Sequence, residues 1–271
     1  MLFRAPGAQA RADRIISLTP SVTEILFALG AGAEVVGVSQ YCDYPPAALK
    51  LPKAGSFLTP NVEAIAALRP TLVIGLSISS DQREIHALQS MGYPFLMISD
   101  DSVEQIEKSI EAIGARIGRA EQARESIDRI HRQIESVRER LTNSRDERVL
   151  MLVGHQPMIA VGRGTYLDDL LKLARADNIA AVSPETWPRL SVEYIIAMHP
   201  DVILDGQMGD DPASPAKYWQ RYATIPAVQN HRVYGYPQDP VLHPGPRIGA
   251  SLEVIAQMIH PGAWQRPEIG K

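Results

Sequence analysis

The fold is decided by a stretch that occurs twice, as Asn61-Val-Glu-Ala-Ile-Ala-Ala-Leu-Arg-Pro70 and again as Ser191-Val-Glu-Tyr-Ile-Ile-Ala-Met-His-Pro200. The second copy begins 130 residues after the first, at position 191 instead of 61. Each copy has Asn or Ser where a helix N-cap is expected, and a proline that ends the helix before an apolar strand. The repeat predicts two lobes built on one plan.

Strand and helix signals alternate on both sides of the repeated stretch. Ser21-Val-Thr-Glu24 is a capping-box pattern that is expected to open the first helix, and Gly30 is expected to end it. This alternation predicts largely parallel sheets with helices on both faces. The expected strands are residues 14–18, 35–38, 72–75, 95–98, 149–153, 159–161, 202–204 and 232–236, and the expected helices are 25–29, 85–91, 165–174 and 247–259.

The middle of the chain predicts one long helix. Apolar residues recur at helical spacing from Ala120 to Leu141, which predicts a rod of more than twenty residues, about 35 Å long. The sequence therefore predicts an α/β fold of two doubly wound lobes joined by one long rigid α-helix, which limits how far the lobes open. The expected parts are an N-terminal tail (1–13), an N-terminal lobe (14–118), the connecting helix (119–142), a C-terminal lobe (147–262) and a C-terminal tail (263–271).

Composition narrows the class of protein. The 271 residues include 27 basic and 31 acidic ones, for a net charge of −4, which argues against a nucleic-acid partner. The single cysteine, Cys42, excludes an internal disulfide and a cysteine metal cluster. No apolar run has the length of about 20 residues that spans a bilayer. Residues 1–13 lack the apolar core of a secretion signal, so either a signal has been removed or the protein stays inside the cell.

The repeat places one glutamate, Glu63 or Glu193, in the first turn of each matched helix. One interpretation is stabilisation of the helix dipole, worth about 0.3–1 kcal/mol each. The other is a pair of docking points, one per lobe, for a partner with two equivalent subunits. The two interpretations are compatible.

Four motifs give the sequence a family resemblance over residues 14–261. The chain resembles the helical-backbone substrate-binding proteins that feed ABC importers of cobalamin, haem and ferric siderophores, and within that family it is most similar to the cobalamin-binding members. The motifs are Ile16-Ser-Leu-Thr-Pro-Ser-Val-Thr-Glu24, Gly37-Val-Ser-Gln-Tyr-Cys-Asp-Tyr-Pro-Pro46, the two Val-Glu-x-Ile helices and Gly162-x-Gly-Thr-Tyr-Leu-Asp-Asp-Leu170.

The resemblance implies particular site residues. Tyr41, Trp187 and Asp239 match residues that line the ligand cleft of the family, and Glu63 and Glu193 match the glutamates that contact arginines of the membrane subunits. The sequence departs from the family at three cleft positions. Two tryptophans of the pattern fall at Phe57 and Leu76, and an arginine falls at about His243. The expected pocket is thus less aromatic than the family pattern.

These matches imply a receptor that captures a corrinoid, cobalamin or cobinamide, in the cleft between the lobes and delivers it to the permease dimer of an ABC importer. We expect a monomer without a cofactor of its own, in the periplasm or at the cell surface. The alternative within the family is a receptor for haem or a ferric siderophore. Haem favours Tyr41 or a histidine as an axial ligand, whereas an anionic siderophore favours arginines, of which Arg163, Arg189 and Arg247 are the candidates.

Histidine and aspartate positions add weaker expectations. None of the seven histidines is spaced as a metal-binding pair, so no metal site is expected, although His155 and His243 lie in loops and are candidate axial ligands. Asp205, Asp210 and Asp211 follow a strand and are expected to form a solvated loop.

An enzyme is the rival from another class. The sequence has neither a nucleophile elbow nor a P-loop, and Gly-x-Gly-x-x-Gly does not follow the first strand. We therefore expect a binding protein rather than an enzyme.

Overall fold

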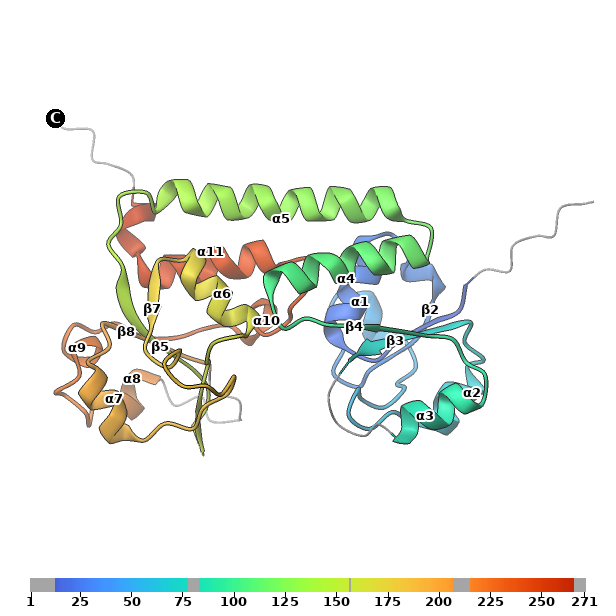
Figure 1. Ribbon diagram of the computed structural model, residues 1–271, viewed down its shortest axis with the longest axis horizontal. Coiled ribbons are helices and arrows are strands. Elements are labelled where there is room, and N and C mark those ends of the chain that lie inside the picture. Colours follow the sequence, from blue (N-terminus) through green and yellow to red (C-terminus); the bar gives the residue numbers. More distant parts are fainter. Residues whose placement is uncertain (1–12, 78–82, 156, 207–214, 266–271) are drawn as a thin grey trace, which may run out of the picture. The chain divides into compact units, whose positions relative to one another are not determined.

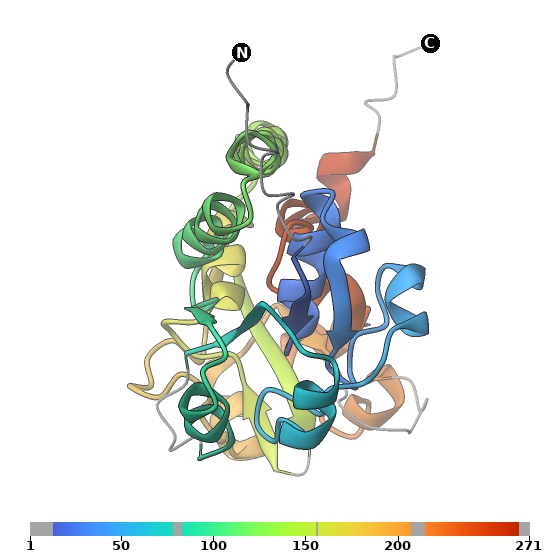
Figure 2. The same ribbon diagram turned by 90° about the vertical axis from the view of Figure 1, so that its right-hand side faces the viewer.

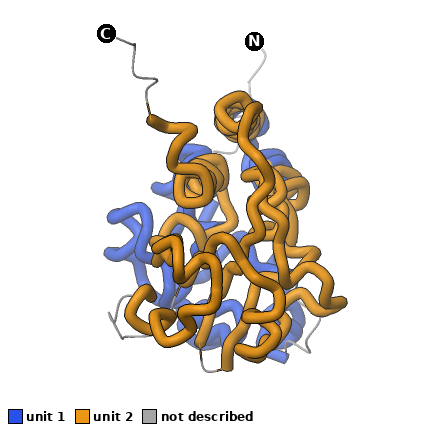
Figure 3. Tube along the Cα trace, turned by 90° about the vertical axis from the view of Figure 1, so that its left-hand side faces the viewer, with its two compact units in different colours: residues 1–99, 111–123 blue, residues 100–110, 124–271 orange. Residues whose placement is uncertain are grey.

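The chain forms two units, each with its own β-sheet (Figure 1). The structure is a computed structural model that describes residues 13–77, 83–155, 157–206 and 215–265. Unit 1 comprises residues 1–99 and 111–123, and unit 2 comprises residues 100–110 and 124–271 (Figure 3). The lobe boundaries expected from the sequence remain a prediction, while the expected α/β class with two lobes is confirmed.

Unit 1 contains a parallel sheet of four strands in the order β2-β1-β3-β4. Its strands are β1 (Ile15–Ser17), β2 (Val35–Val38), β3 (Leu72–Leu76) and β4 (Phe95–Ile98). The helices between them are α1 (Pro20–Ala28), α2 (Val62–Ala67) and α3 (Arg83–Ser90), with 3-10 turns η1 (Gly32–Glu34) and η2 (Pro46–Lys50).

Helices α2 and α3 lie side by side on one face of this sheet (Figures 1 and 2). Their buried residues Ile65, Ile85 and Leu88 join strand residues Ile16 and Val73 in one apolar cluster. Every one of these side chains is 5% exposed or less, so the two helices and the strands share one apolar core.

The described residues of unit 2 form a sheet of five strands, in which all strand pairs are parallel except β5–β6. The strands are β5 (Glu147–His155), β6 (Met158–Ala160), β7 (Ala176–Asn178), β8 (Val202–Asp205) and β9 (Val233–Gly235). The helices are α6 (Tyr166–Leu173), α7 (Val192–Met198), α8 (Pro215–Trp219), α9 (Pro226–Gln229), α10 (Gln238–Val241) and α11 (Ile248–Ile259), followed by η3 (Pro261–Trp264).

One core cluster of unit 2 forms where α7, α8 and α9 pack on the sheet. Ile195 and Trp219 are fully buried there against Leu150 and Ile203 of the strands. Trp219 has the largest of the fully buried side chains, and burying an aromatic of this size contributes several kcal/mol to an apolar core.

Two long helices, α4 (Val103–Arg116) and α5 (Ala120–Arg140), carry the chain from one unit to the other. Within unit 1 they approach so closely that a Cβ at Gly114 would lie 2.5 Å from the Cβ of Ala123. Within unit 2, a Cβ at Gly249 of α11 would lie 2.7 Å from the Cβ of Gln133 on α5. Glycine at these two places therefore lets α5 pack tightly in each unit.

The motif that begins at Gly162 has a structural role in the described residues. Thr165 Oγ1 accepts a hydrogen bond from the Asp168 backbone N–H at 3.1 Å and caps α6. The buried Asp168 carboxylate accepts a hydrogen bond from Asn178 Nδ2 at 2.7 Å and forms an ion pair with Lys172 at 2.6 Å. The pKa of Lys172 is raised by this hydrogen bond to Asp168. The motif thus ties α6 to β7.

Two expectations about local structure were wrong or incomplete. The N-cap of α1 is Thr19, whose Oγ1 accepts a hydrogen bond from Val22 N–H, rather than Ser21. The reason is Pro20, which is preorganised for the first helical position and draws the helix start forward. The short elements β7, α8, α9 and α10 were not expected.

No helix among the described residues is both long enough and apolar enough to cross a bilayer.

Candidate functional site

The carboxyl ends of the unit 1 strands bring several predicted site residues to one edge of the sheet. Leu76 ends β3, and Tyr41 follows β2 by three residues. Residues 52–55 extend this edge, because Val38 N–H donates to Pro52 O at 2.9 Å and Gln40 N–H donates to Gly55 O at 2.8 Å. Phe57 therefore comes to the same edge as Tyr41. In parallel sheets this edge is the usual site of ligand binding.

Tyr41 is held in an exposed position by its buried neighbour. Its side chain is 60% exposed, whereas Cys42 is 1% exposed and lies 3.1 Å from the hydroxyl oxygen of Thr23. Lys53 Nζ donates to the Cys42 carbonyl oxygen at 3.0 Å, which fixes the loop further. Burial raises the pKa of the Cys42 thiol, so the sulfur stays protonated and anchors the loop.

Phe57 and Leu76 are only partly buried. Phe57 packs on the apolar cluster that contains Ile65 and Leu88, which leaves part of its ring uncovered. The turn that carries it is closed by a hydrogen bond of 2.9 Å between the hydroxyls of Ser56 and Thr59. Both predicted residues thus keep part of their surface uncovered.

Hydroxyl groups line the start of α1 at this edge. Thr23 Oγ1 donates to Ser17 Oγ at 2.7 Å and lies 3.2 Å from the Thr19 carbonyl oxygen. The hydroxyls of Thr19 and Ser21 are 3.0 Å apart. All four side chains are buried, so short neutral hydrogen bonds satisfy the polar groups here.

The carboxyl edge of the unit 2 sheet contains a buried aspartate in contact with a histidine instead. His155, the last residue of β5, places Nε2 2.6 Å from both carboxylate oxygens of Asp205, the last residue of β8. The Asp205 side chain is 0% exposed and that of His155 is 15% exposed. The expectation that Asp205 belongs to a solvated loop was wrong, because its carboxylate is enclosed by protein; Asp210 and Asp211 lie outside the described residues.

Aromatic side chains surround this pair. Trp219 Nε1 donates to Asp205 Oδ2 at 2.8 Å, and the Tyr218 ring meets the His155 ring edge-on with centroids 4.4 Å apart. The Tyr236 hydroxyl donates to the Leu152 carbonyl oxygen at 2.9 Å. Burial, together with the negative charge of Asp205, raises the pKa of Tyr236 well above its usual value.

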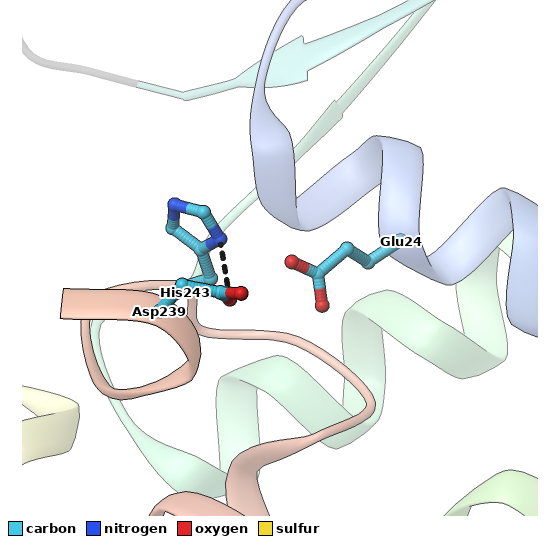
Figure 4. A group of neighbouring side chains, drawn as sticks. All are labelled: Glu24, Asp239 and His243. Carbon is cyan, nitrogen blue, oxygen red and sulfur yellow. Dashed lines mark ion pairs between the residues drawn. The ribbon is translucent and has the colours of Figure 1, made fainter. Parts of the chain in front are cut away.

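Asp239 and His243 come together in unit 2 just after β9. His243 Nδ1 lies 3.3 Å from Asp239 Oδ1 (Figure 4). Arg247, the residue before α11, also forms an ion pair with Asp239. A histidine and an arginine therefore flank one carboxylate that is 42% exposed. The contact between Arg247 and Asp239 was not foreseen from the sequence.

Trp187 lies in a segment that pairs with β6. Ala160 N–H donates to Pro188 O and Leu190 N–H donates to Met158 O, both at 3.0 Å. This pairing adds residues around 188 to the edge of the sheet and holds Trp187 with 44% of its surface exposed. An indole this exposed in a fixed backbone segment is available for a ligand.

Glu63 and Glu193 occupy equivalent places in the two units. Asn61 Oδ1 accepts a hydrogen bond from Ala64 N–H at 3.0 Å, and Ser191 Oγ accepts one from Tyr194 N–H at 3.2 Å. Both glutamates are exposed in the first turn that follows. Hydrogen bonds from its own backbone N–H and from Ser191 lower the pKa of Glu193, so its charge persists into mildly acidic solution.

The structure brings the predicted residues together within each unit only in part. Tyr41, Phe57 and Leu76 share one edge in unit 1, and Asp239 contacts His243 in unit 2. Sequence reasoning missed the Asp205–Trp219 partnership of His155. The available signal was the position of Asp205 at the end of an apolar strand, where a charged side chain is unusual unless it is paired.

Comparison with known proteins places this geometry in a family. A family model described as periplasmic binding protein matches residues 15–240. A vitamin B12-binding protein of Vibrio cholerae serotype O1 is 29% identical over 257 residues, covering 94% of this chain and 92% of the relative. One of Yersinia pestis (strain Pestoides F) is 30% identical over 221 residues, covering 82% of this chain and 79% of the relative.

Two solved structures of periplasmic binding proteins share the fold of this chain. The periplasmic vitamin B12 binding protein of Vibrio cholerae has a TM-score of 0.80 at 27% identity and covers 94% of this chain and 99% of its own. A periplasmic heme-binding protein from Roseiflexus sp. RS-1 has a TM-score of 0.83 at 27% identity and covers 93% of this chain and 100% of its own. The chain therefore belongs to the periplasmic binding protein family, as a non-enzymatic substrate-binding receptor of an ABC importer.

Proposed function

We propose that this receptor binds a corrinoid, either cobalamin or cobinamide. The observation that carries the proposal is the exposure of two aromatic side chains on fixed loops, Tyr41 at 60% and Trp187 at 44%. Leaving aromatic surface in water costs about 25 cal/mol per Å². A flat macrocycle with an apolar face would cover such surface, and the vitamin B12-binding relatives support this class of ligand.

The proposed contacts come from both units. Tyr41, Phe57 and Leu76 of unit 1 would contact apolar parts of the corrinoid. Trp187 and His243 of unit 2 would do likewise, and the Asp239 carboxylate would accept hydrogen bonds from amide N–H groups on the corrin rim. A carboxylate accepts hydrogen bonds from the amides of a corrinoid, whereas the ionised propionates of haem have no hydrogen to donate, which gives this residue a role in selectivity.

The test is a set of calorimetric titrations with cyanocobalamin, dicyanocobinamide, haemin and a ferric hydroxamate siderophore. We expect both corrinoids to bind with 1:1 stoichiometry and more tightly than haemin or the siderophore. Preferential binding of haemin or of the siderophore would refute the corrinoid assignment while leaving the receptor class intact.

Haem is the second candidate, favoured by the exposed phenol of Tyr41 and by the heme-binding structural relative. A tyrosinate ligand gives ferric haem a characteristic visible spectrum. If haem is the natural ligand, Tyr41→Phe abolishes that spectrum; if corrinoids are, Tyr41→Phe keeps most of their affinity, because the ring remains.

We propose that Glu63 and Glu193 dock the receptor on the permease dimer of the importer. The support is their equivalence: residues 61–70 and 191–200 have the same sequence of exposed, partly buried and buried positions, and both glutamates are exposed. Two matched carboxylates suit a partner with two equivalent subunits that presents arginines.

Charge reversal tests the docking proposal. Glu63→Lys with Glu193→Lys should abolish ligand uptake into cells or permease-containing vesicles while ligand affinity in solution stays unchanged. The matched control is Glu84→Lys with Glu104→Lys, which reverses one first-turn glutamate in each unit on helices α3 and α4. Unimpaired uptake by the first pair, or equal loss in the control, would contradict the assignment.

The remaining proposals concern the oligomeric state, the cofactor content and the cellular location of the protein. We propose a monomer without a resident cofactor that acts in the periplasm or at the cell surface. Light scattering of the purified chain should give the mass of one copy, and cell fractionation should find the protein outside the cytoplasm.

A further inference from the structure

A pocket of about 610 Å³ lies at the amino ends of β5 and β7 in unit 2. It is thus at the edge of the sheet opposite to the carboxyl ends of β5 and β8, where His155 and Asp205 lie. All of its lining residues except Ala176 are charged: Asp146, Arg148, Lys172, Arg175 and Asp177. Three cations and two carboxylates leave an excess of positive charge, which favours an anionic ligand.

Arg175 has a backbone conformation that usually belongs to glycine. It follows Ala174, the C-cap of α6, with a φ of 53° in the left-handed region. Glycine is the common residue at this position of a helix end, because a side chain is unfavourable there. The ion pair of Arg175 with Asp146 contributes little to stability, since the two side chains are 41% and 67% exposed. An arginine at this position therefore points to a role for its guanidinium.

The two guanidinium groups of the pocket have donors that no protein acceptor uses. Arg175 pairs with Asp146 through Nη2, whereas its Nε is buried and has no hydrogen-bond partner among the described residues. In the part of the chain that the structure describes, Arg148 donates through its backbone N–H, and its guanidinium has neither a hydrogen bond nor an ion pair. Buried donors without an acceptor are uncommon in folded proteins, so an acceptor from a ligand is expected here.

The other charged residues of the pocket are compatible with an anion. Lys172 Nζ lies 2.6 Å from Asp168 and 3.6 Å from Asp169, and an ammonium has three N–H donors, so one remains for a ligand. Asp146 and Asp177 are both exposed, and water therefore weakens their repulsion of an anion.

We propose that this pocket binds a phosphate group, with Arg148 and Arg175 as the main donors and Lys172 as a further cation. Arginine presents its N–H groups in a planar fork that matches phosphate oxygens, and such charge-assisted hydrogen bonds are strong. The group is either inorganic phosphate in solution or the phosphate of a lipid headgroup, because the same donors recognise both. The pocket is separate from the proposed corrinoid site and needs no corrinoid to be bound.

The first measurement is a phosphorus NMR titration of the full chain with inorganic phosphate, in which chloride keeps the ionic strength constant. We expect saturable binding of one phosphate per chain. Arg175→Gly keeps the left-handed backbone, because glycine adopts it freely, but removes the guanidinium. It should weaken phosphate binding about 10-fold to 100-fold, the loss expected when hydrogen bonds to a charged group are removed. Arg148→Gln should weaken it as well.

The second measurement is co-sedimentation with phosphatidylcholine vesicles that contain phosphatidic acid, whose headgroup is a phosphate monoester. Vesicles of phosphatidylcholine alone are the reference. Binding of inorganic phosphate assigns the site to phosphate in solution. Co-sedimentation with phosphatidic acid, without binding of inorganic phosphate, assigns it to a lipid headgroup. Both results support the proposal, provided that Arg175→Gly and Arg148→Gln reduce the binding.

Arg69→Gly is the matched control. Arg69 is another exposed arginine with a positive φ, 46°, and it follows α2 in unit 1, outside the pocket. Its replacement by glycine makes the same change of residue at a similar backbone conformation and should leave phosphate binding unchanged. An equal loss in Arg69→Gly would overturn the assignment to the pocket.

Two further outcomes decide the proposal. If neither inorganic phosphate nor phosphatidic acid vesicles bind the wild type, or if Arg175→Gly and Arg148→Gln bind them as the wild type does, the phosphate site is refuted. The titrations with corrinoids are independent of this test. A wild type that binds phosphate but no corrinoid would refute the proposed function and leave the phosphate site standing.

Discussion

The two units share a helix–strand plan but differ in the chemistry of their carboxyl edges. The repeated helices α2 and α7 have equivalent caps and equivalent exposed glutamates. At the edge of unit 1, buried hydroxyls such as Thr23 and Ser17 satisfy one another. At the edge of unit 2, a buried carboxylate holds a histidine. The comparison shows that one architecture supports a cluster of hydroxyls at the edge of one unit and a histidine–aspartate contact at the edge of the other.

The largest expected effect comes from removing the unit 2 charge. Asp205→Ala leaves the donors of His155 and Trp219 without their acceptor, and breaking a buried pair costs about 3–5 kcal/mol of unfolding free energy. The unit 1 counterpart, Thr23→Val, removes neutral hydrogen bonds and should cost about 1 kcal/mol. Urea denaturation measures both. If Asp205→Ala and Thr23→Val lost the same unfolding free energy, the interactions at the two edges would contribute equally to stability, which would contradict this comparison.

Tight packing of α5 should be similar in the two units. Gly249→Leu forces a side chain against Gln133, and Gly114→Leu forces one against Ala123. Overpacking of this kind costs about 1–3 kcal/mol. Thermal unfolding of both variants would check it, with Gly262→Leu as the control, because a Cβ at Gly262 meets nothing within 4 Å. A neutral Gly249→Leu would show that α5 is loosely packed in unit 2.

The repeated caps give a smaller and symmetrical expectation. Asn61→Ala and Ser191→Ala each remove an acceptor for a backbone N–H at the start of α2 or α7. Each should lower the unfolding free energy by about 1 kcal/mol. Chemical denaturation of the single variants and of the double variant should show additive losses. A much larger effect in one copy would show that the two helices are not equivalent.

The smallest expected effect is a pH dependence in unit 2. Burial lowers the pKa of His260, whose Nε2 lies 2.9 Å from the Ala174 carbonyl oxygen. Between the unfolded pKa of about 6.5 and the lower folded value, the unfolded chain binds the proton first, so stability is lost as the pH falls. His260→Gln should flatten the slope of unfolding free energy between pH 7 and pH 5. If the wild type and His260→Gln show the same slope of unfolding free energy against pH, His260 does not contribute to the pH dependence.

The regular elements were largely predictable, because their signals are local. The apolar spacing from Ala120 to Leu141 predicted α5, and the repeated stretch predicted α2 and α7 with their caps. The short elements β7, α8, α9 and α10 have three to five residues each, too few for a periodic pattern. Their positions depend on contacts with the sheet.

The candidate site was harder to predict from the sequence for the same reason. Tyr41 could be singled out by its motif, and its exposure follows from the burial of Cys42. The environment of Asp205 could not be predicted, because its partners His155 and Trp219 lie 50 and 14 residues away along the chain. Side chains brought together by tertiary packing have no periodic signature, so a buried aspartate after a strand looks the same in sequence as a solvated one.

The most direct test is the affinity of Tyr41→Ala and Trp187→Ala for cyanocobalamin, measured by calorimetry beside the wild type. If one exposed aromatic from each unit covers the macrocycle, the wild type binds one corrinoid and each variant loses about 1–3 kcal/mol of binding free energy. Wild-type affinity in both variants, or a wild-type protein that does not bind the corrinoid, would contradict this account.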